Sequence, residues 1–97
     1  MTEYLNAVIY KIYPLSHGEK GDIYIGSTIL SLNDEFQEHI ENCYRPIKKV
    51  MYDTERLFIK YGSNNCEISL IETFPCNSKE VLEKRTNEII RKLNKVR

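Results

Sequence analysis

The chain has 97 residues, of which 41% are hydrophobic and 29% are charged, and its formal net charge at pH 7 is zero. This length suits a single domain, residues 1–97, with one modest core, and the composition excludes an intrinsically disordered chain. The neutral charge argues weakly against a protein that binds nucleic acid without specificity, because such proteins are usually basic.

The sequence contains no apolar run long enough to cross a membrane, and its N-terminal segment lacks the basic and apolar blocks of a signal peptide. We therefore expect an intracellular protein. Its cysteines, Cys43, Cys66 and Cys76, lack the spacing of a metal site and predict free thiols in a reducing compartment.

Two strands are predicted near the N-terminus. Residues 7–13 are β-branched and aromatic and precede Pro14, with Val8, Tyr10 and Ile12 expected on one face. Residues 22–26 predict the second strand, and the polar loop between the two favours an antiparallel hairpin.

Residues 31–43 predict a helix that begins after Ser31, with Asp34 three residues on to complete the cap. Glu35 and His39 are four residues apart and are expected to be neighbours at the edge of the buried stripe. That stripe consists of Leu32, Phe36, Ile40 and Cys43.

A second helix is predicted over residues 46–61, beginning at Pro46 and ending at Gly62. Residues 66–74 predict a third strand, with Cys66, Ile68 and Leu70 on one face. The last helix is capped by Asn77 or Ser78, and its apolar stripe is Leu82, Ile89, Ile90 and Leu93, with Val81 beside it. The order β-β-α-α-β-α predicts an α+β sandwich, a small and mostly antiparallel three-stranded sheet flanked by three helices.

Four stretches, "VIYKIY", "IYIGST", "LNDEFQEH" and "FIKYG", together resemble the GIY-YIG nuclease superfamily. In that family adjacent strands carry Gly-Ile-Tyr and Tyr-Ile-Gly, and the resemblance covers nearly the whole chain. It implies the GIY-YIG fold, a DNA substrate and metal-dependent hydrolysis of a phosphodiester bond with Mg²⁺ or Mn²⁺.

The first motif falls on Val8-Ile9-Tyr10, with Val in place of Gly, and the second falls intact on Tyr24-Ile25-Gly26. The resemblance implies that Tyr10 takes a proton from the attacking water and that Tyr24 helps to position the reacting groups. The family's helix histidine falls on His39. Without the resemblance, both tyrosines read as ordinary strand aromatics and His39 as a residue on a helix face.

The family's arginine position is Glu35 here, and its metal-binding glutamate position is Thr86. Glu35 has the wrong charge beside a phosphate, and a single neutral hydroxyl is a poor ligand for Mg²⁺ or Mn²⁺. Glu88 lies about 200° round the helix from Thr86 and cannot replace it. We therefore expect impaired catalysis and doubtful binding of the metal, although Glu35 and His39 also resemble a metal-binding pair.

The alternative function is a pseudo-nuclease that binds nucleic acid or a protein without cutting. Arg45, Lys48 and Lys49 are candidate contacts to nucleic acid. The chain has no room for a separate DNA-binding domain, so a partner protein or a homo-oligomer is a possible source of specificity. Gly26 is expected to leave space beside Tyr24 for a phosphate or for the facing helix.

Overall fold

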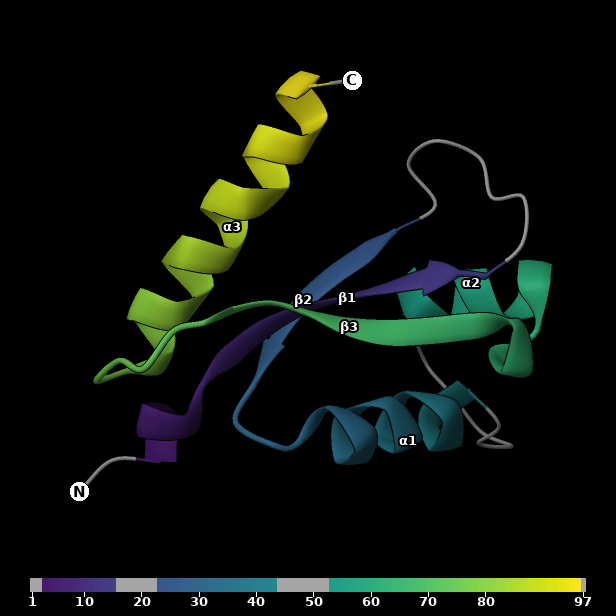
Figure 1. Ribbon diagram of the computed structural model, residues 1–97, viewed down its shortest axis with the longest axis horizontal. Coiled ribbons are helices and arrows are strands. Elements are labelled where there is room, and N and C mark those ends of the chain that lie inside the picture. The colour runs from purple at the N-terminus through teal and green to yellow at the C-terminus, as the bar shows by residue number, and fades with distance from the viewer. Residues whose placement is uncertain (1–2, 16–22, 44–52, 97) are drawn as a thin grey trace.

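A computed structural model describes residues 3–15, 23–43 and 53–96 of the chain (Figure 1). The strands are β1 (Val8–Pro14), β2 (Tyr24–Thr28) and β3 (Cys66–Thr73). The α-helices are α1 (Leu32–Cys43), α2 (Asp53–Tyr61) and α3 (Lys79–Val96), and short 3-10 helices span Glu3–Asn6 and Ser63–Asn65. This order confirms the predicted β-β-α-α-β-α arrangement and the α+β fold class.

The sheet has the strand order β2-β1-β3, and both pairings are antiparallel. On one side Tyr10 pairs with Gly26, and on the other side it pairs with Leu70. A bulge interrupts the second pairing, because Ile9 pairs with Glu72 and leaves Ile71 without a partner on β1. Tyr10, the tyrosine of the first motif, therefore lies on the central strand between β2 and β3.

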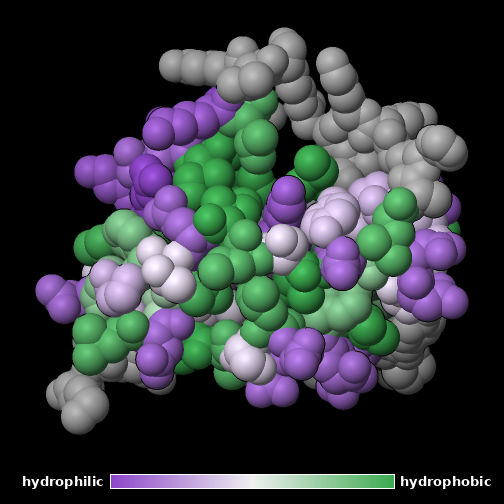
Figure 2. Space-filling view, viewed as in Figure 1, coloured by the Kyte–Doolittle hydropathy of each residue, from purple (hydrophilic) through white to green (hydrophobic). Residues whose placement is uncertain are grey.

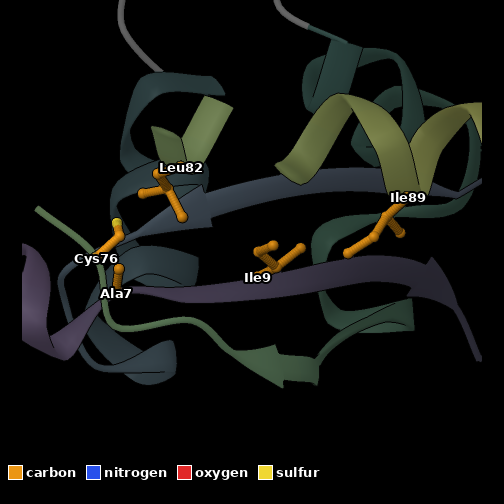
Figure 3. Close-up of a cluster of buried hydrophobic side chains, with 5 residues drawn as sticks. All are labelled: Ala7, Ile9, Cys76, Leu82 and Ile89. Atoms are coloured by element: carbon orange, nitrogen blue, oxygen red, sulfur yellow. The ribbon is translucent and has the colours of Figure 1, made fainter. Parts of the chain in front are cut away.

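Alternation along β1 divides the core between the two faces of the sheet. Ala7 and Ile9 belong to the cluster under α3, which also contains Cys76, Leu82 and Ile89 (Figure 3). Tyr10 and Ile12 belong to the other cluster, which packs against α1 and α2 and contains Leu57, Phe58 and Cys66. Figure 1 shows α3 on one side of the sheet and α1 on the other. The first strand's predicted faces are confirmed.

Several strand ends differ from the prediction by one or two residues, and β3 ends at Thr73 rather than at residue 74. The second strand is Tyr24–Thr28 rather than residues 22–26, because the backbones of Ser27 and Thr28 pair with Ile9 and Val8. The first strand continues into Pro14, which pairs with Cys66. Proline is tolerated there because the pairing of β1 with β2 ends at Ile12, so no second neighbour requires the missing amide hydrogen.

The predicted helix ends are largely confirmed. The hydroxyl oxygens of Ser31 and Ser78 accept hydrogen bonds from the amides three residues later, at 3.2 and 3.3 Å. Gly62 ends α2 with a φ of 88°, a value that favours glycine, and its amide donates to the carbonyl of Phe58 at 2.8 Å. The predicted start of this helix at Pro46 lies outside the described residues.

The apolar stripes are buried less completely than predicted. None of the α1 residues is fully buried, although its stripe packs against the core. On α3, Leu82 and Ile89 are buried, whereas Val81 and Leu93 remain 46% and 41% exposed, and Leu70 of β3 is 47% exposed. Figure 2 accordingly shows hydrophobic residues at the surface among hydrophilic ones.

Among the described helices, none has the length and hydropathy of a membrane span.

Candidate functional site

Four of the side chains singled out from the sequence meet between the sheet and α1. Tyr10 comes from β1 and is 1% exposed, and Tyr24 lies on β2 next to it. The two rings are tilted with their centroids 6.1 Å apart. Glu35 and His39 come from α1, one turn apart, and their side chains are 13% and 16% exposed. Tyr10, Tyr24, Glu35 and His39 therefore form one cluster, which lies just below the surface.

Gly26 makes room for the two tyrosine rings. A Cβ atom on this residue would lie 2.7 Å from the hydroxyl of Tyr10 and 2.8 Å from Cε2 of Tyr24. Distances below 3.0 Å require a neighbour to move. The expected space beside Tyr24 does exist, but the aromatic side chains fill it, and it admits neither a phosphate nor the facing helix.

Three polar atoms form a tight triangle at the centre of the cluster. The Tyr10 hydroxyl donates to Oε2 of Glu35 at 2.7 Å and lies 2.8 Å from Nε2 of His39. Nε2 in turn lies 3.0 Å from the same Glu35 oxygen. Because the single hydroxyl hydrogen of Tyr10 points at Glu35, Nε2 carries a hydrogen of its own and donates within the triangle.

The triangle keeps Tyr10 protonated. Burial contributes most to raising the pKa of Tyr10, followed by the hydrogen bond to Glu35 and the charges of Tyr24 and Glu35. Burial also works to raise the pKa of Glu35, but hydrogen bonds from His39, Tyr10 and Thr28 outweigh it and the net pKa is lowered. At neutral pH the triangle therefore holds a phenol and a carboxylate.

Thr28 is a member of the site that the sequence did not indicate. Its hydroxyl helps to lower the pKa of Glu35, and its Oγ1 accepts a hydrogen bond from the amide of Leu30 at 3.0 Å. The side chain is 8% exposed. Its position two residues after Gly26 on the same strand face was the available signal, but the strand was predicted to end at residue 26.

Aromatic packing fixes the orientation of His39. Its ring meets Tyr24 edge to face with centroids 5.5 Å apart, and it meets Tyr10 in the same manner at 6.0 Å. Glu35 and His39 therefore lie at the edge of the α1 stripe, as predicted, and both turn toward the sheet. The Glu35 carboxylate is therefore mostly covered rather than solvated.

Thr86 faces inward on α3 and is 7% exposed, whereas Glu88 is exposed. The Thr86 hydroxyl donates to the carbonyl of Leu82 at 2.8 Å. This one neutral oxygen, already bonded within its own helix, does not fit the role of a ligand for Mg²⁺. Nor do the described residues contain a group of three or more His, Cys, Asp or Glu side chains placed to hold a metal ion.

A pocket of about 330 Å³ adjoins the cluster on the side of Thr28 and Glu35. Its charged lining consists of Glu35, Glu38, Glu83 and Lys79. This lining is mostly acidic and disfavours a phosphate. The basic candidates Arg45, Lys48 and Lys49 lie outside the described residues.

No family model and no curated protein sequence matches this chain. Among solved structures, it is similar to the catalytic domain of the homing endonuclease I-TevI, with 25% sequence identity and a TM-score of 0.66. The similarity covers 91% of this chain and 88% of that one. The architecture is that of the GIY-YIG catalytic domain fold.

Proposed function

We propose that this chain is a GIY-YIG-type domain that acts on DNA and whose own hydrolysis of the phosphodiester bond is strongly impaired. The similarity to the I-TevI catalytic domain supports the nuclease-like origin. The observation that carries the impairment is the 2.7 Å hydrogen bond from the Tyr10 hydroxyl to the carboxylate of Glu35.

This hydrogen bond opposes the chemistry that the resemblance implies for Tyr10. A base must accept a proton from water, but Tyr10 donates its hydrogen to Glu35 and its pKa is raised, chiefly by burial. Glu35 also places a negative charge where an arginine would stabilise the phosphate. Loss of one such stabilising group lowers the rate of an enzyme by about 10²–10³-fold, and reversal of its charge is more damaging.

Thr86 is the second cause of the proposed impairment, because it replaces the glutamate that binds the metal ion in the family. In the family that the chain resembles, a bound Mg²⁺ or Mn²⁺ ion would polarise the phosphate and offset charge on the leaving oxygen. Thr86 supplies no carboxylate for such an ion, and its hydroxyl is engaged by Leu82. The proposed impairment therefore has two independent physical causes.

The test is nicking of a supercoiled plasmid in the presence of Mg²⁺ or Mn²⁺. The unmodified chain is expected to show no metal-dependent nicking. The double variant Glu35→Arg with Thr86→Glu is expected to restore it, and each single variant to restore much less, because the two groups act in one transition state. Circular dichroism and a thermal melt establish that each variant is folded.

Two outcomes contradict the proposal. Robust nicking by the unmodified chain that Tyr10→Phe abolishes would show that the substitutions are compatible with catalysis. A folded double variant that binds DNA and still does not nick would show that the scaffold is not a disabled nuclease of this type.

A second candidate is a binding module that has lost catalysis and recognises a protein. The zero net charge and the acidic lining of the pocket favour it over strong DNA binding. Fluorescence anisotropy with a labelled DNA duplex at low and moderate salt separates the two candidates. Salt-dependent binding supports a DNA-acting domain, and its absence at low salt favours the protein-binding module.

A further inference from the structure

We propose that Tyr10, Glu35 and His39 form a binding site for a divalent transition-metal ion, at a position distinct from Thr86. The site consists of the phenol oxygen of Tyr10, Oε2 of Glu35 and Nε2 of His39. It requires neither DNA nor hydrolysis, so it holds or fails separately from the function proposed above.

The spacing of the three donor atoms suits an ion bound on their common face. They are separated by 2.7, 2.8 and 3.0 Å. Ligand atoms about 2.0–2.1 Å from a metal ion, with angles of roughly 90–110° between them, are about 2.9–3.4 Å apart. Two of the observed separations lie just below this range, and the third is at its lower end. Opening it by a few tenths of an ångström therefore converts the hydrogen-bonded cluster into a three-ligand face.

The backbone and the neighbouring side chains hold these donors in advance. Glu35 and His39 are one helical turn apart on α1, and edge-to-face packing on Tyr24 and Tyr10 orients the imidazole. Thr28 also forms a side-chain hydrogen bond with Glu35, as outer-shell partners do with the carboxylates of metal sites. Partial exposure of Glu35 and His39, 13% and 16%, leaves a route for the ion from solvent.

The charge of the cluster favours a cation. Glu35 is ionised at neutral pH and is largely removed from water, so a dication beside it compensates a negative charge that hydrogen bonds alone now stabilise. Binding requires Nε2 of His39 to give up its hydrogen, so the neutral ring must carry its hydrogen on Nδ1. Tyr10 contributes its oxygen as the third donor.

The donor types select the class of ion. Imidazole nitrogen together with oxygen ligands suits Zn²⁺ and Co²⁺. Mg²⁺ prefers an all-oxygen set with carboxylates, and this site offers one carboxylate. Three protein donors leave a further position on the ion for water.

The experiment is calorimetric titration of the reduced, metal-free chain with Zn²⁺, alongside titration with Mg²⁺. One Zn²⁺ per chain is expected, and Glu35→Gln and His39→Gln are each expected to weaken its binding by at least about 10-fold. Tyr10→Phe should weaken it less. The matched controls Glu41→Gln on α1, Cys43→Ser and His17→Ala should leave the affinity unchanged.

Co²⁺ provides a second readout that does not depend on the stability of any variant. In the unmodified chain we expect visible absorption bands typical of nitrogen and oxygen ligands, without the near-ultraviolet band of a cobalt–thiolate bond. A thiolate band would overturn the proposal, as would Zn²⁺ affinity that survives both Glu35→Gln and His39→Gln, or that Cys43→Ser or His17→Ala removes. Failure of the chain to bind Zn²⁺ or Co²⁺ would overturn it as well, whatever the nicking assay gives.

Discussion

Gly26 and the hydroxyl of Tyr10 face each other across β2 and β1 so closely that a methyl group on Gly26 would lie 2.7 Å from the Tyr10 oxygen. The motif glycine is therefore a packing requirement of the motif tyrosine. This relationship explains why a residue that weakens strands stands inside β2.

Substitution Gly26→Ala should destabilise the fold by about 1–3 kcal/mol, because the added Cβ overlaps the rings of both Tyr10 and Tyr24. Urea unfolding followed by circular dichroism measures the loss. Ser27→Ala is the control on the same strand, expected within about 0.5 kcal/mol of the parent. An unchanged midpoint for Gly26→Ala would mean that the rings can move aside at little cost.

The raised pKa of Tyr10 predicts a loss of stability in alkali. An unfolded tyrosine ionises near pH 10, whereas burial and Glu35 hold Tyr10 protonated well beyond that. Its contribution to stability is therefore complete below about pH 10 and decreases above it, by at most about 1.4 kcal/mol per pH unit. Unfolding free energies from pH 8 to 11 should decrease less steeply for Tyr10→Phe.

Tyr13 is the control for this measurement. Its pKa is also raised, by a hydrogen bond to Glu67, but this pair lies at the surface. Tyr13→Phe should leave the alkaline slope nearly unchanged. Equal slopes for the parent and Tyr10→Phe would contradict the description of Tyr10.

The lowered pKa of Glu35 predicts a loss of stability in acid. A glutamate in the unfolded chain ionises near pH 4.3, and the pKa of Glu35 in the folded chain lies below its ordinary value. The stability that the carboxylate contributes to the fold is therefore present above about pH 4.3. It is lost as the pH falls through the folded pKa. Glu35→Gln should lower the unfolding free energy by about 1–2 kcal/mol at pH 7 and by much less at pH 3. The exposed Glu41→Gln is the matched control, and a pH-independent difference would refute the assignment.

The ion pair between Arg85 and Glu72 should stabilise the packing of α3 on β3. Its two hydrogen bonds, at 2.8 and 2.9 Å, make it bidentate, and both side chains are less than one-third exposed. Arg85→Met is expected to lower the free energy of unfolding by more than the control variant does. The control is Lys79→Met, since Lys79 and Glu83 are 3.8 Å apart and mostly exposed. A double-mutant cycle with Glu72→Gln isolates the pair, and a coupling energy near zero would show that the bidentate geometry adds nothing.

The fold could be predicted because its signals are local. Alternation around Tyr10, the serine caps and Gly62 each depend on residues a few positions apart. The end of β2 could not be predicted, because Ser27 and Thr28 resemble turn residues until their pairing with Ile9 and Val8 is known. Spacing on α1 also indicated that Glu35 and His39 are neighbours. Their hydrogen bonds to Tyr10 join residues 25 and 29 positions apart, which no local pattern reports.

The bulge at Ile71 determines where β3 tolerates a change in length. Removal of Ser69 or Glu67 would turn the residues on one side of the deletion to the opposite face and exchange core with solvent. Removal of Ile71 would instead leave Leu70 opposite Tyr10 and Glu72 opposite Ile9, so the ladder would become regular and only one side chain of the α3 cluster would be lost. Among related chains, a β3 shorter by one residue at this point can therefore preserve the same tyrosine cluster.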